Sequence, residues 1–298
     1  MDTEARKSGN AARPKRARER LDALLVARGL APSRERARAL IMAGEVRVAG
    51  QMATKAGTLV AADATIELAA ASETRFVSRG GLKLERALDA FCLDPTGAIC
   101  LDVGASTGGF TDLLLQRGAA RVYAVDVGHG QLAWTLRNDP RVTVMERTNI
   151  RHLEALPERV DCAVIDVSFI SLRLVLPRVS TLLKPEGWVV ALVKPQFEAG
   201  RAEADRGGGV IREPAVHRRV LRELLSWAKD EMAPVTAERR LMACELIASP
   251  ITGRDGNHEY LLLLRPSDTE GCRPLNEQDI EAAIQQAFAD SARGAAEN

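Results

Sequence analysis

Seven short apolar runs between residues 99 and 264 constrain the fold of this chain more than any other feature. They alternate with segments of helical periodicity, and several are apolar on both faces, which is typical of parallel strands covered by helices on each side. The runs lie at 99–104, 121–126, 141–145, 161–167, 187–193, 240–248 and 258–264. Helices are expected near 82–91, 109–117, 130–138, 171–183 and 214–231. Since no helix separates the last two runs, the final strand is expected to return antiparallel.

Polar residues and a glycine lie at or just after the ends of several of these runs. A parallel sheet binds its ligands at the carboxyl ends of its strands, which is where these residues are expected. They are Asp102 with Gly104, then Asp126, Asn149, Asp166 and Lys194. Any one of them could be a strand terminator that favours a turn. Their succession along the chain indicates a ligand site.

The turn after the first run, LDVGASTGGFTD at 101–112, distinguishes among cofactors. A P-loop needs a lysine after its last glycine, and none follows Gly109. The dinucleotide fingerprint G-x-G-x-x-G has a different spacing, and Asp102 would repel a pyrophosphate. A carboxylate at this position suits a ligand with a cationic end, such as S-adenosylmethionine.

Two further positions concern the nucleoside part of such a ligand. Asp126 lies 22 residues after Gly104 and is placed to accept both hydroxyls of an adenosine ribose, a position that NAD enzymes share. Asn149 could contact the adenine edge or cap the next helix, and both interpretations stay open.

A smaller, strongly basic module precedes the sheet. Residues 1–50 hold twelve Lys and Arg against six Asp and Glu, a difference of +6, whereas the whole chain has a formal net charge of +1. A basic part joined to a near-neutral body is expected of a nucleic-acid binder, although a solvated arginine-rich helix would look the same. Residues 1–18 have no apolar period and are expected to form a disordered tail.

The rest of the basic module has its own pattern. Residues 20–30 and 33–43 show helical periodicity, and short alternating runs at 45–53 and 65–70 indicate strands. This segment resembles the S4 RNA-binding domain. The resemblance implies four RNA-facing arginines, which are Arg20, Arg34, Arg36 and Arg38.

Composition excludes several classes of protein. No apolar stretch approaches the roughly 20 residues that span a bilayer, and the first residues lack the apolar core of a signal peptide. The five cysteines and four histidines are dispersed, so we expect reduced thiols, no metal site and a cytoplasmic location.

Six motifs occur in order along the chain: SRGGLKLERAL, DVGASTGGFTD, AVDVGHGQL, IDVSFISL, VKPQFEAGR and SPITGRDGNHEYLL. Together they resemble the TlyA family of ribosomal RNA 2′-O-methyltransferases from about Arg20 to Leu264. The resemblance implies an S4 domain at 19–70, a linker at 71–78, an FtsJ-like methyltransferase domain at 79–266 and a C-terminal tail at 267–298. The implied fold is a Rossmann-like α/β sheet, mostly parallel with an antiparallel last strand.

The same resemblance implies an activity. The expected cofactor is S-adenosylmethionine, and the expected substrate is the ribose of a cytidine in large-subunit ribosomal RNA, with small-subunit RNA as an additional target of some members. Ribosomal RNA or ribosomal subunits are the expected partners, and no DNA or membrane partner is expected. The alternatives are a membrane-active haemolysin, a label the family has also carried, and an RNA-binding protein without catalysis.

Four residues match the catalytic tetrad of FtsJ-like enzymes: Lys83, Asp166, Lys194 and Glu259. Lys83 could instead be an exposed helical lysine, Asp166 a helix cap, and Glu245 is a competitor for Glu259. The implied roles make Lys194 the base that takes the 2′-hydroxyl proton or a purely positional charge, with Asp166 orienting it near the methyl donor. Glu259 would hold Lys83 or the ribose.

The implied cofactor site draws on the glycine-rich turn and on the ends of the next strands. Its expected members are Asp102, Gly104, Ala105, Ser106, Gly108, Gly109, Phe110, Asp126, Val127, Asn149 and Asp166.

Overall fold

The structure is a computed structural model that divides into two compact units, residues 1–73 and 74–298. It describes residues 18–31, 33–42, 46–53, 55–68, 75–200, 203, 207–232, 240–253 and 255–294. The expected tail up to residue 17 and most of the expected linker lie outside these ranges.

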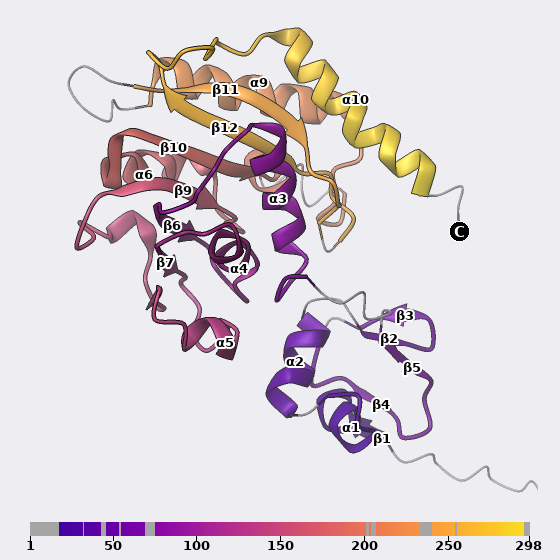
Figure 1. Ribbon diagram of the computed structural model, residues 1–298. Helices are drawn as coiled ribbons and strands as arrows, with labels where there is room; N and C mark the ends of the chain where they lie inside the picture. The colour runs from indigo at the N-terminus through magenta and orange to yellow at the C-terminus, as the bar shows by residue number, and fades with distance from the viewer. Residues whose placement is uncertain are drawn as a thin grey trace, which may run out of the picture. The chain divides into compact units, whose positions relative to one another are not determined.

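The large unit is built on one seven-stranded sheet (Figure 1). Its strands are β6 (Ile99–Val103), β7 (Arg121–Val125), β8 (Val142–Met145), β9 (Val160–Ile165), β10 (Leu183–Val193), β11 (Leu241–Ala248) and β12 (Tyr260–Pro266). The order across the sheet is β11-β12-β10-β9-β6-β7-β8. The neighbours from β10 to β8 run parallel, and β12 is antiparallel to both β10 and β11. The predicted Rossmann-like α/β fold with an antiparallel last strand is therefore confirmed.

Helices cover both faces of the sheet because its central strands are apolar on both sides. One face packs against α3 (Gly80–Ala90), α4 (Gly109–Gln116) and α5 (Trp134–Arg137), and the other against α6 (Leu176–Leu182), α9 (Pro214–Asp230) and α10 (Glu277–Gly294). Along β10, Val189 belongs to one core and its neighbour Val190 to the other. Shorter elements are η1 (Ile150–His152), η2 (Leu172–Leu174) and α7 (Pro195–Glu198).

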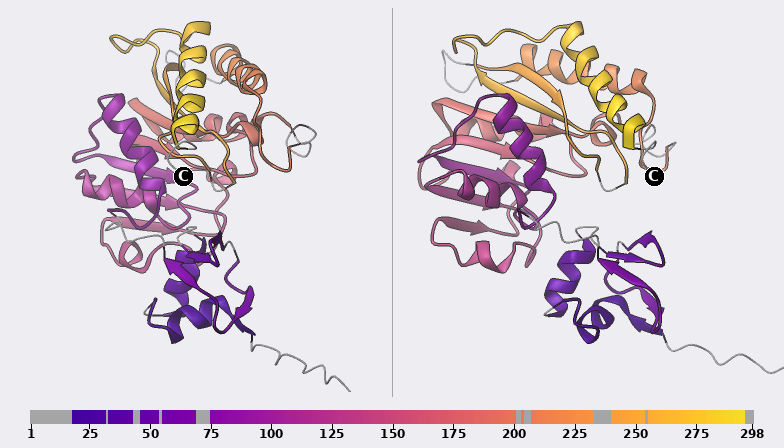
Figure 2. Two further views of the ribbon diagram at one scale, coloured as in Figure 1. Left: turned by 90° about the vertical axis from the view of Figure 1, so that its right-hand side faces the viewer. Right: turned by 45° about the vertical axis from the view of Figure 1, so that its right-hand side comes forward.

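The C-terminal segment is part of the large unit and not the tail that was expected from residue 267. Helix α10 lies beside α9 and packs on β11 (Figures 1 and 2). It buries an apolar stripe with helical spacing, Ile280, Ala283, Ile284 and Ala287. A disulfide joins Cys244 of β11 to Cys272, just before this helix, so the expectation of five reduced cysteines is wrong for this pair.

The small unit contains two helices and five short strands among the residues that the structure describes. Helices α1 (Leu21–Ala27) and α2 (Arg34–Met42) enclose a core with the strands β1 (Arg18–Arg20), β2 (Val46–Val48), β3 (Gln51–Met52), β4 (Leu59–Ala61) and β5 (Ile66–Leu68). Strand β1 pairs antiparallel with β4, so Arg18 lies in a strand and not in the expected tail.

The end of the expected linker also has a defined place. Phe76 is buried in the core of the large unit, and the Val77 amide donates a hydrogen bond of 2.7 Å to Oδ2 of Asp112 on α4. The large unit therefore begins a few residues before the predicted domain boundary at 79.

Candidate active site

A cavity of about 420 Å³ opens at the carboxyl ends of the parallel strands. Its lining residues come from the ends of β6 and β7 and from the segments that follow β6, β7, β8 and β9: Val103, Gly104, Ser106, Val125, Asp126, Val127, Gln131, Thr148, Asn149, Ile150, Asp166, Val167, Ser168, Phe169, Ile170 and Val175. These residues include two carboxylates and no Lys, Arg or His. Such a lining attracts a cationic ligand and repels a phosphorylated one.

Gly104 allows the close approach of two strands at the floor of this cavity. Its φ of +84° lies in the left-handed region, and a Cβ atom there would lie 2.5 Å from the carbonyl oxygen of Asp166. A side chain at this position would therefore push β6 away from the end of β9.

Asp126 is held in one orientation by backbone amides. Its Oδ2 accepts a hydrogen bond of 2.8 Å from the amide of Ser106, and its Oδ1 accepts one of 2.6 Å from the amide of Gly128. Each carboxylate oxygen has a second lone pair. Asp126 can thus accept ligand hydroxyls from the cavity without losing these bonds.

Six of the eleven expected cofactor residues line the cavity: Gly104, Ser106, Asp126, Val127, Asn149 and Asp166. Asn149 also does what its alternative interpretation proposed, because its Oδ1 accepts a hydrogen bond of 3.1 Å from the Arg151 amide and caps η1. Asp102, Ala105, Gly108, Gly109 and Phe110 are not among the lining residues.

Packing explains the glycine pair and the phenylalanine outside the cavity. A Cβ atom on Gly109 would lie 2.3 Å from Oγ of Ser78 and 2.9 Å from the amide nitrogen of Gly81, at the crossing of α4 and α3. At Gly108, with a φ of +98°, it would meet the side chain of Leu136. Phe110 is buried in the core beneath. Gly109 thus allows the close approach of α3, which carries Lys83.

Asp102 lies fully buried under the turn rather than in the cavity. Thr111 of α4 donates a hydrogen bond of 2.6 Å to its Oδ2, while Oδ1 has no hydrogen-bond partner among the described residues. Burial raises the pKa of Asp102 to about 7, and the negative charges of Asp166 and Asp126 act in the same direction. Asp102 is therefore not among the residues that line the cavity, and its expected contact with a cationic ligand end stays a prediction.

The four tetrad residues form two ion pairs. Lys194 Nζ lies 2.5 Å from Oδ1 of Asp166, and Lys83 Nζ lies 2.5 Å from Oε2 of Glu259. The side chain of Lys83 is only 11% exposed, so it is not a solvated helical lysine. The competitor Glu245 is exposed on β11.

The electrostatics couple the two pairs. Burial tends to raise the pKa of Asp166, but the charges of Lys194 and Lys83 outweigh it and hold that pKa below its ordinary value. Burial raises the pKa of Glu259 despite the opposing charges of Lys83 and Lys194. The helix-cap alternative for Asp166 is not seen, because Ser171 caps η2.

Several residues of this region escaped the sequence analysis. Ser168 accepts a hydrogen bond of 3.0 Å from Lys194 Nζ, and a hydroxyl two residues after Asp166 was a signal that could have been used. Phe169 is 90% exposed with a φ of +63°, and its ring centroid lies 4.9 Å from that of Phe197. Nothing in the sequence marks Phe169 as exposed.

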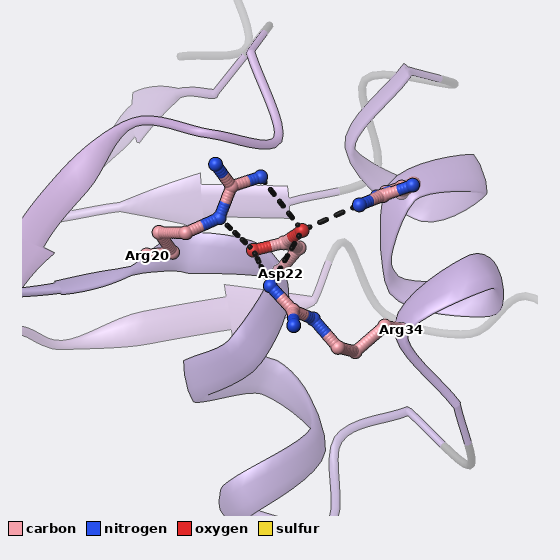
Figure 3. A network of polar contacts seen from close by, with 4 residues as sticks. Arg20, Asp22 and Arg34 are labelled. Atoms are coloured by element: carbon pink, nitrogen blue, oxygen red, sulfur yellow. Dashed lines mark hydrogen bonds and ion pairs between the residues drawn. The ribbon is translucent and has the colours of Figure 1, made fainter.

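The expected RNA-facing arginines are found in the small unit (Figure 3). Arg20, Arg34 and Arg38 all pair with one carboxylate, Asp22, which the sequence analysis did not single out. Arg36 lies on α2, but its side chain is outside the part of the chain that the structure describes.

Fold and site together define an α/β enzyme of the methyltransferase type with an appended small domain. Residues 76–266 match the model of the FtsJ-like methyltransferases, and residues 19–66 match that of the S4 domain. The chain belongs to the TlyA family of FtsJ-like methyltransferases, as its full-length relatives establish.

Three of these relatives are informative. The chain is 46% identical to YqxC from Bacillus subtilis, over 91% of this chain and 94% of that protein. It is also 46% identical to the 16S/23S rRNA (cytidine-2′-O)-methyltransferase TlyA of Mycobacterium tuberculosis, over 92% and 98%. A solved structure of a protein from Streptococcus thermophilus has a TM-score of 0.70 at 41% identity, and the match covers 93% of this chain and 98% of that chain.

Proposed function

We propose that this protein transfers a methyl group from S-adenosylmethionine to the 2′-hydroxyl of a cytidine in ribosomal RNA. The observation that carries the proposal is the pair of buried ion pairs, Lys194 with Asp166 and Lys83 with Glu259, beside a cavity lined by carboxylates but by no basic side chain. The names of the TlyA relatives support the ribosomal substrate. Such a substrate implies action in the cytoplasm.

The cavity residues fit the proposed cofactor, which supplies the methyl group as a sulfonium. Asp126 would accept the ribose hydroxyls, and Asn149 with Ile150 would border the adenine. Gly104 and Ser106 would contact the amino-acid end, and the carboxylate of Asp166 would lie near the sulfonium. Among the described residues, no group of three or more side chains could hold a metal ion.

The tetrad would act on the acceptor hydroxyl. Asp166 and Ser168 orient the amine of Lys194, and we assign to Lys194 the removal of the 2′-hydroxyl proton. Glu259 fixes Lys83, whose charge would stabilise the developing alkoxide. Alignment of the hydroxyl with the methyl group would provide much of the rate.

RNA recognition is assigned to two surfaces. The arginines of the small unit would bind phosphates, which positions an RNA without reading its sequence. The exposed ring of Phe169 at the cavity offers a stacking surface for an unpaired base. The paired tetrad supports catalysis over the alternative of an inactive RNA-binding protein.

The test is transfer of labelled methyl from S-adenosylmethionine to ribosomal subunits. We expect Glu259→Gln to lower the rate by about 100-fold, because Lys83 loses its charged partner. The matched control Glu245→Gln removes the exposed competitor on β11 and should retain the wild-type rate. If the wild-type protein labels no ribosomal particle, the proposal is wrong.

A liposome-leakage assay with the same preparation addresses the haemolysin alternative. Among the described residues, no helix is both long and apolar enough to cross a membrane. Leakage without methyl transfer would favour the membrane-active interpretation.

A further inference from the structure

Asp22 is an acidic residue on the apolar face of a helix. It lies on α1 beside Leu21, Leu24 and Leu25, which form the core of the small unit, and it is itself 0% exposed. A buried carboxylate is costly unless charged partners surround it. Its retention in the core of so small a unit therefore calls for a specific set of partners.

Three guanidinium groups from two elements supply that set (Figure 3). Arg20 of β1 donates from Nε and Nη2 to the two carboxylate oxygens of Asp22, both at 3.0 Å. From α2, Nη2 of Arg34 lies 3.4 Å from both oxygens, and Nε of Arg38 lies 3.2 Å from Oδ2. These hydrogen bonds hold the pKa of Asp22 well below its ordinary value, and the bond from Arg20 has the largest effect. The carboxylate therefore stays ionised.

The backbone of the small unit fixes this carboxylate in place. The amides of Leu21 and Asp22 donate to the carbonyls of Thr58 and Ala56, at 2.9 and 3.1 Å. The guanidinium of Arg20 packs over Gly57 in the same turn, where a Cβ atom would lie 3.3 Å from Nη1. Asp22 is thus a rigid anchor to which the three longer side chains are tied.

The arginines remain available to a ligand although they are tied. Their side chains are 47%, 54% and 56% exposed, and each guanidinium keeps most of its five N–H donors beyond those that Asp22 accepts. Arg28 offers a contrast, because its guanidinium donates to the carbonyls of Ala62 and Ala64 within the unit. One carboxylate among three guanidinium groups leaves a local excess of positive charge that suits the phosphates of RNA.

We propose that Asp22 is a positioning residue for RNA binding, which holds Arg20, Arg34 and Arg38 in a fixed arrangement to receive backbone phosphates. The inference rests on the proposed function, since it assumes that the small unit binds the RNA that the large unit methylates. Ordering three flexible side chains before binding removes an entropic cost that the complex would otherwise bear. The carboxylate therefore strengthens binding to a polyanion although it carries the same sign of charge.

The variant Asp22→Asn, compared with Glu67→Gln, tests this inference. Glu67 is exposed on β5 of the same unit, so both substitutions raise the net charge by one. A simple charge effect tightens RNA binding by both variants. Positioning predicts instead that Asp22→Asn weakens binding to a ribosomal RNA transcript by about tenfold, whereas Glu67→Gln binds as tightly as wild type or more tightly.

Methyl-transfer kinetics on ribosomal subunits distinguish a failure of the positioning role of Asp22 from a failure of the proposed function. We expect Asp22→Asn to raise KM by about tenfold with kcat unchanged, because the variant leaves the catalytic unit intact. If wild type transfers methyl but Asp22→Asn behaves like Glu67→Gln, the positioning role is wrong while the proposed function stands. If wild type transfers none, the proposed function fails first.

A measurement on the wild-type full-length chain covers the case in which Asp22→Asn does not fold. Nitrogen relaxation of the arginine Nε–H groups should show Arg20 and Arg38 nearly as ordered as the backbone without RNA, and Arg47, exposed on β2, much more mobile. Equal mobility of all three would overturn the proposal.

Discussion

At the scale of single residues, the chemistry of the site depends on which charges are paired. Lys194 and Lys83 each lie 2.5 Å from a carboxylate, and all four groups come from different parts of the chain. Both lysines act on the charge of Asp166, and two cations in a largely buried site need both acids to stay in place. Removing one member therefore disturbs the partner it leaves behind as well as the reaction.

The substitution Lys194→Arg tests whether this lysine is a base. Arginine keeps the positive charge and can pair with Asp166, but it does not release a proton at neutral pH. We expect methyl transfer to fall by about 100-fold or more, with the affinity for S-adenosylhomocysteine changed by less than about twofold, as measured by calorimetry. Retained activity would show that the charge is only positional.

Asp102 predicts a pH dependence of stability. Its pKa is raised to about 7 in the folded chain, whereas an unfolded aspartate titrates near about 4. Between these values the folded state holds a proton that the unfolded state has released, so the free energy of unfolding decreases as pH rises through this window. Below about pH 4 both states are protonated and the penalty is absent.

The isosteric change Asp102→Asn removes that penalty. Without cofactor, the Tm of Asp102→Asn minus that of wild type should be larger at about pH 8 than at about pH 5. The corresponding change in the difference in free energy of unfolding is a few kcal/mol, on the order of that expected from the pKa shift. The control Glu154→Gln changes an exposed residue of the same unit and should leave the pH profile unchanged. An Asp102→Asn difference that is the same at both pH values would contradict the expectation.

At the scale of elements, helix crossings decide where the side chains of the proposed tetrad lie. The GG pair after β6 looked like a cofactor contact in the sequence, but Gly109 lies where α4 meets the start of α3. Packing of α3 there determines where Lys83 is presented. A glycine-rich turn that contacts a ligand and one that packs against a helix have the same sequence pattern. In each of them, close approach requires that a side chain be missing.

We therefore expect Gly109→Ala to impair catalysis more than cofactor binding. Its Cβ atom would lie 2.9 Å from the Gly81 amide nitrogen, which displaces α3 and should lower kcat by about tenfold or more. Gly80→Ala is the matched control, because its Cβ atom meets neighbours only at 3.4 Å or beyond. A selective loss of S-adenosylhomocysteine binding by Gly109→Ala would restore the interpretation as a cofactor contact.

The elements that the sequence analysis missed differ in what their local sequence pattern shows. Strands β1 and β4 are only three residues long and gain their stability from each other, so neither shows a local period. Helix α10 has an apolar stripe, but its surroundings in the sequence lack a family motif. Its place against α9 and β11 comes from burial, which no local pattern specifies.

At the scale of the whole molecule, two kinds of binding are assigned to two units of different electrostatic character. The cavity proposed to bind the cofactor, in the large unit, has no basic side chain among its lining residues, while the small unit presents exposed arginines. Binding of RNA phosphates releases counterions and therefore weakens steeply as the salt concentration rises. A nucleoside ligand without phosphates releases no such counterions, so its binding in a cavity should depend much less on salt.

Raising the salt concentration from about 50 to about 200 mM should therefore distinguish RNA binding from cofactor binding. We expect the affinity for ribosomal RNA to fall by about tenfold or more, and that for S-adenosylhomocysteine to change by less than about twofold. Filter binding and calorimetry at each salt concentration provide the comparison. A parallel loss of both affinities would mean that cofactor and RNA use the same charges.

The sequence by itself determined the alternating α/β fold and the antiparallel last strand, because apolar periodicity is a local property of the chain. The four tetrad residues were proposed from the family resemblance of the motifs that contain them. Only the tertiary structure decided which partners those residues have. Lys83 and Glu259 are 176 residues apart in sequence and yet form an ion pair. Asp102 passed from an expected ligand contact to a buried group, and Asp22 emerged as the centre of the arginine cluster. Burial and charge pairing depend on contacts between distant segments, which folding alone brings together.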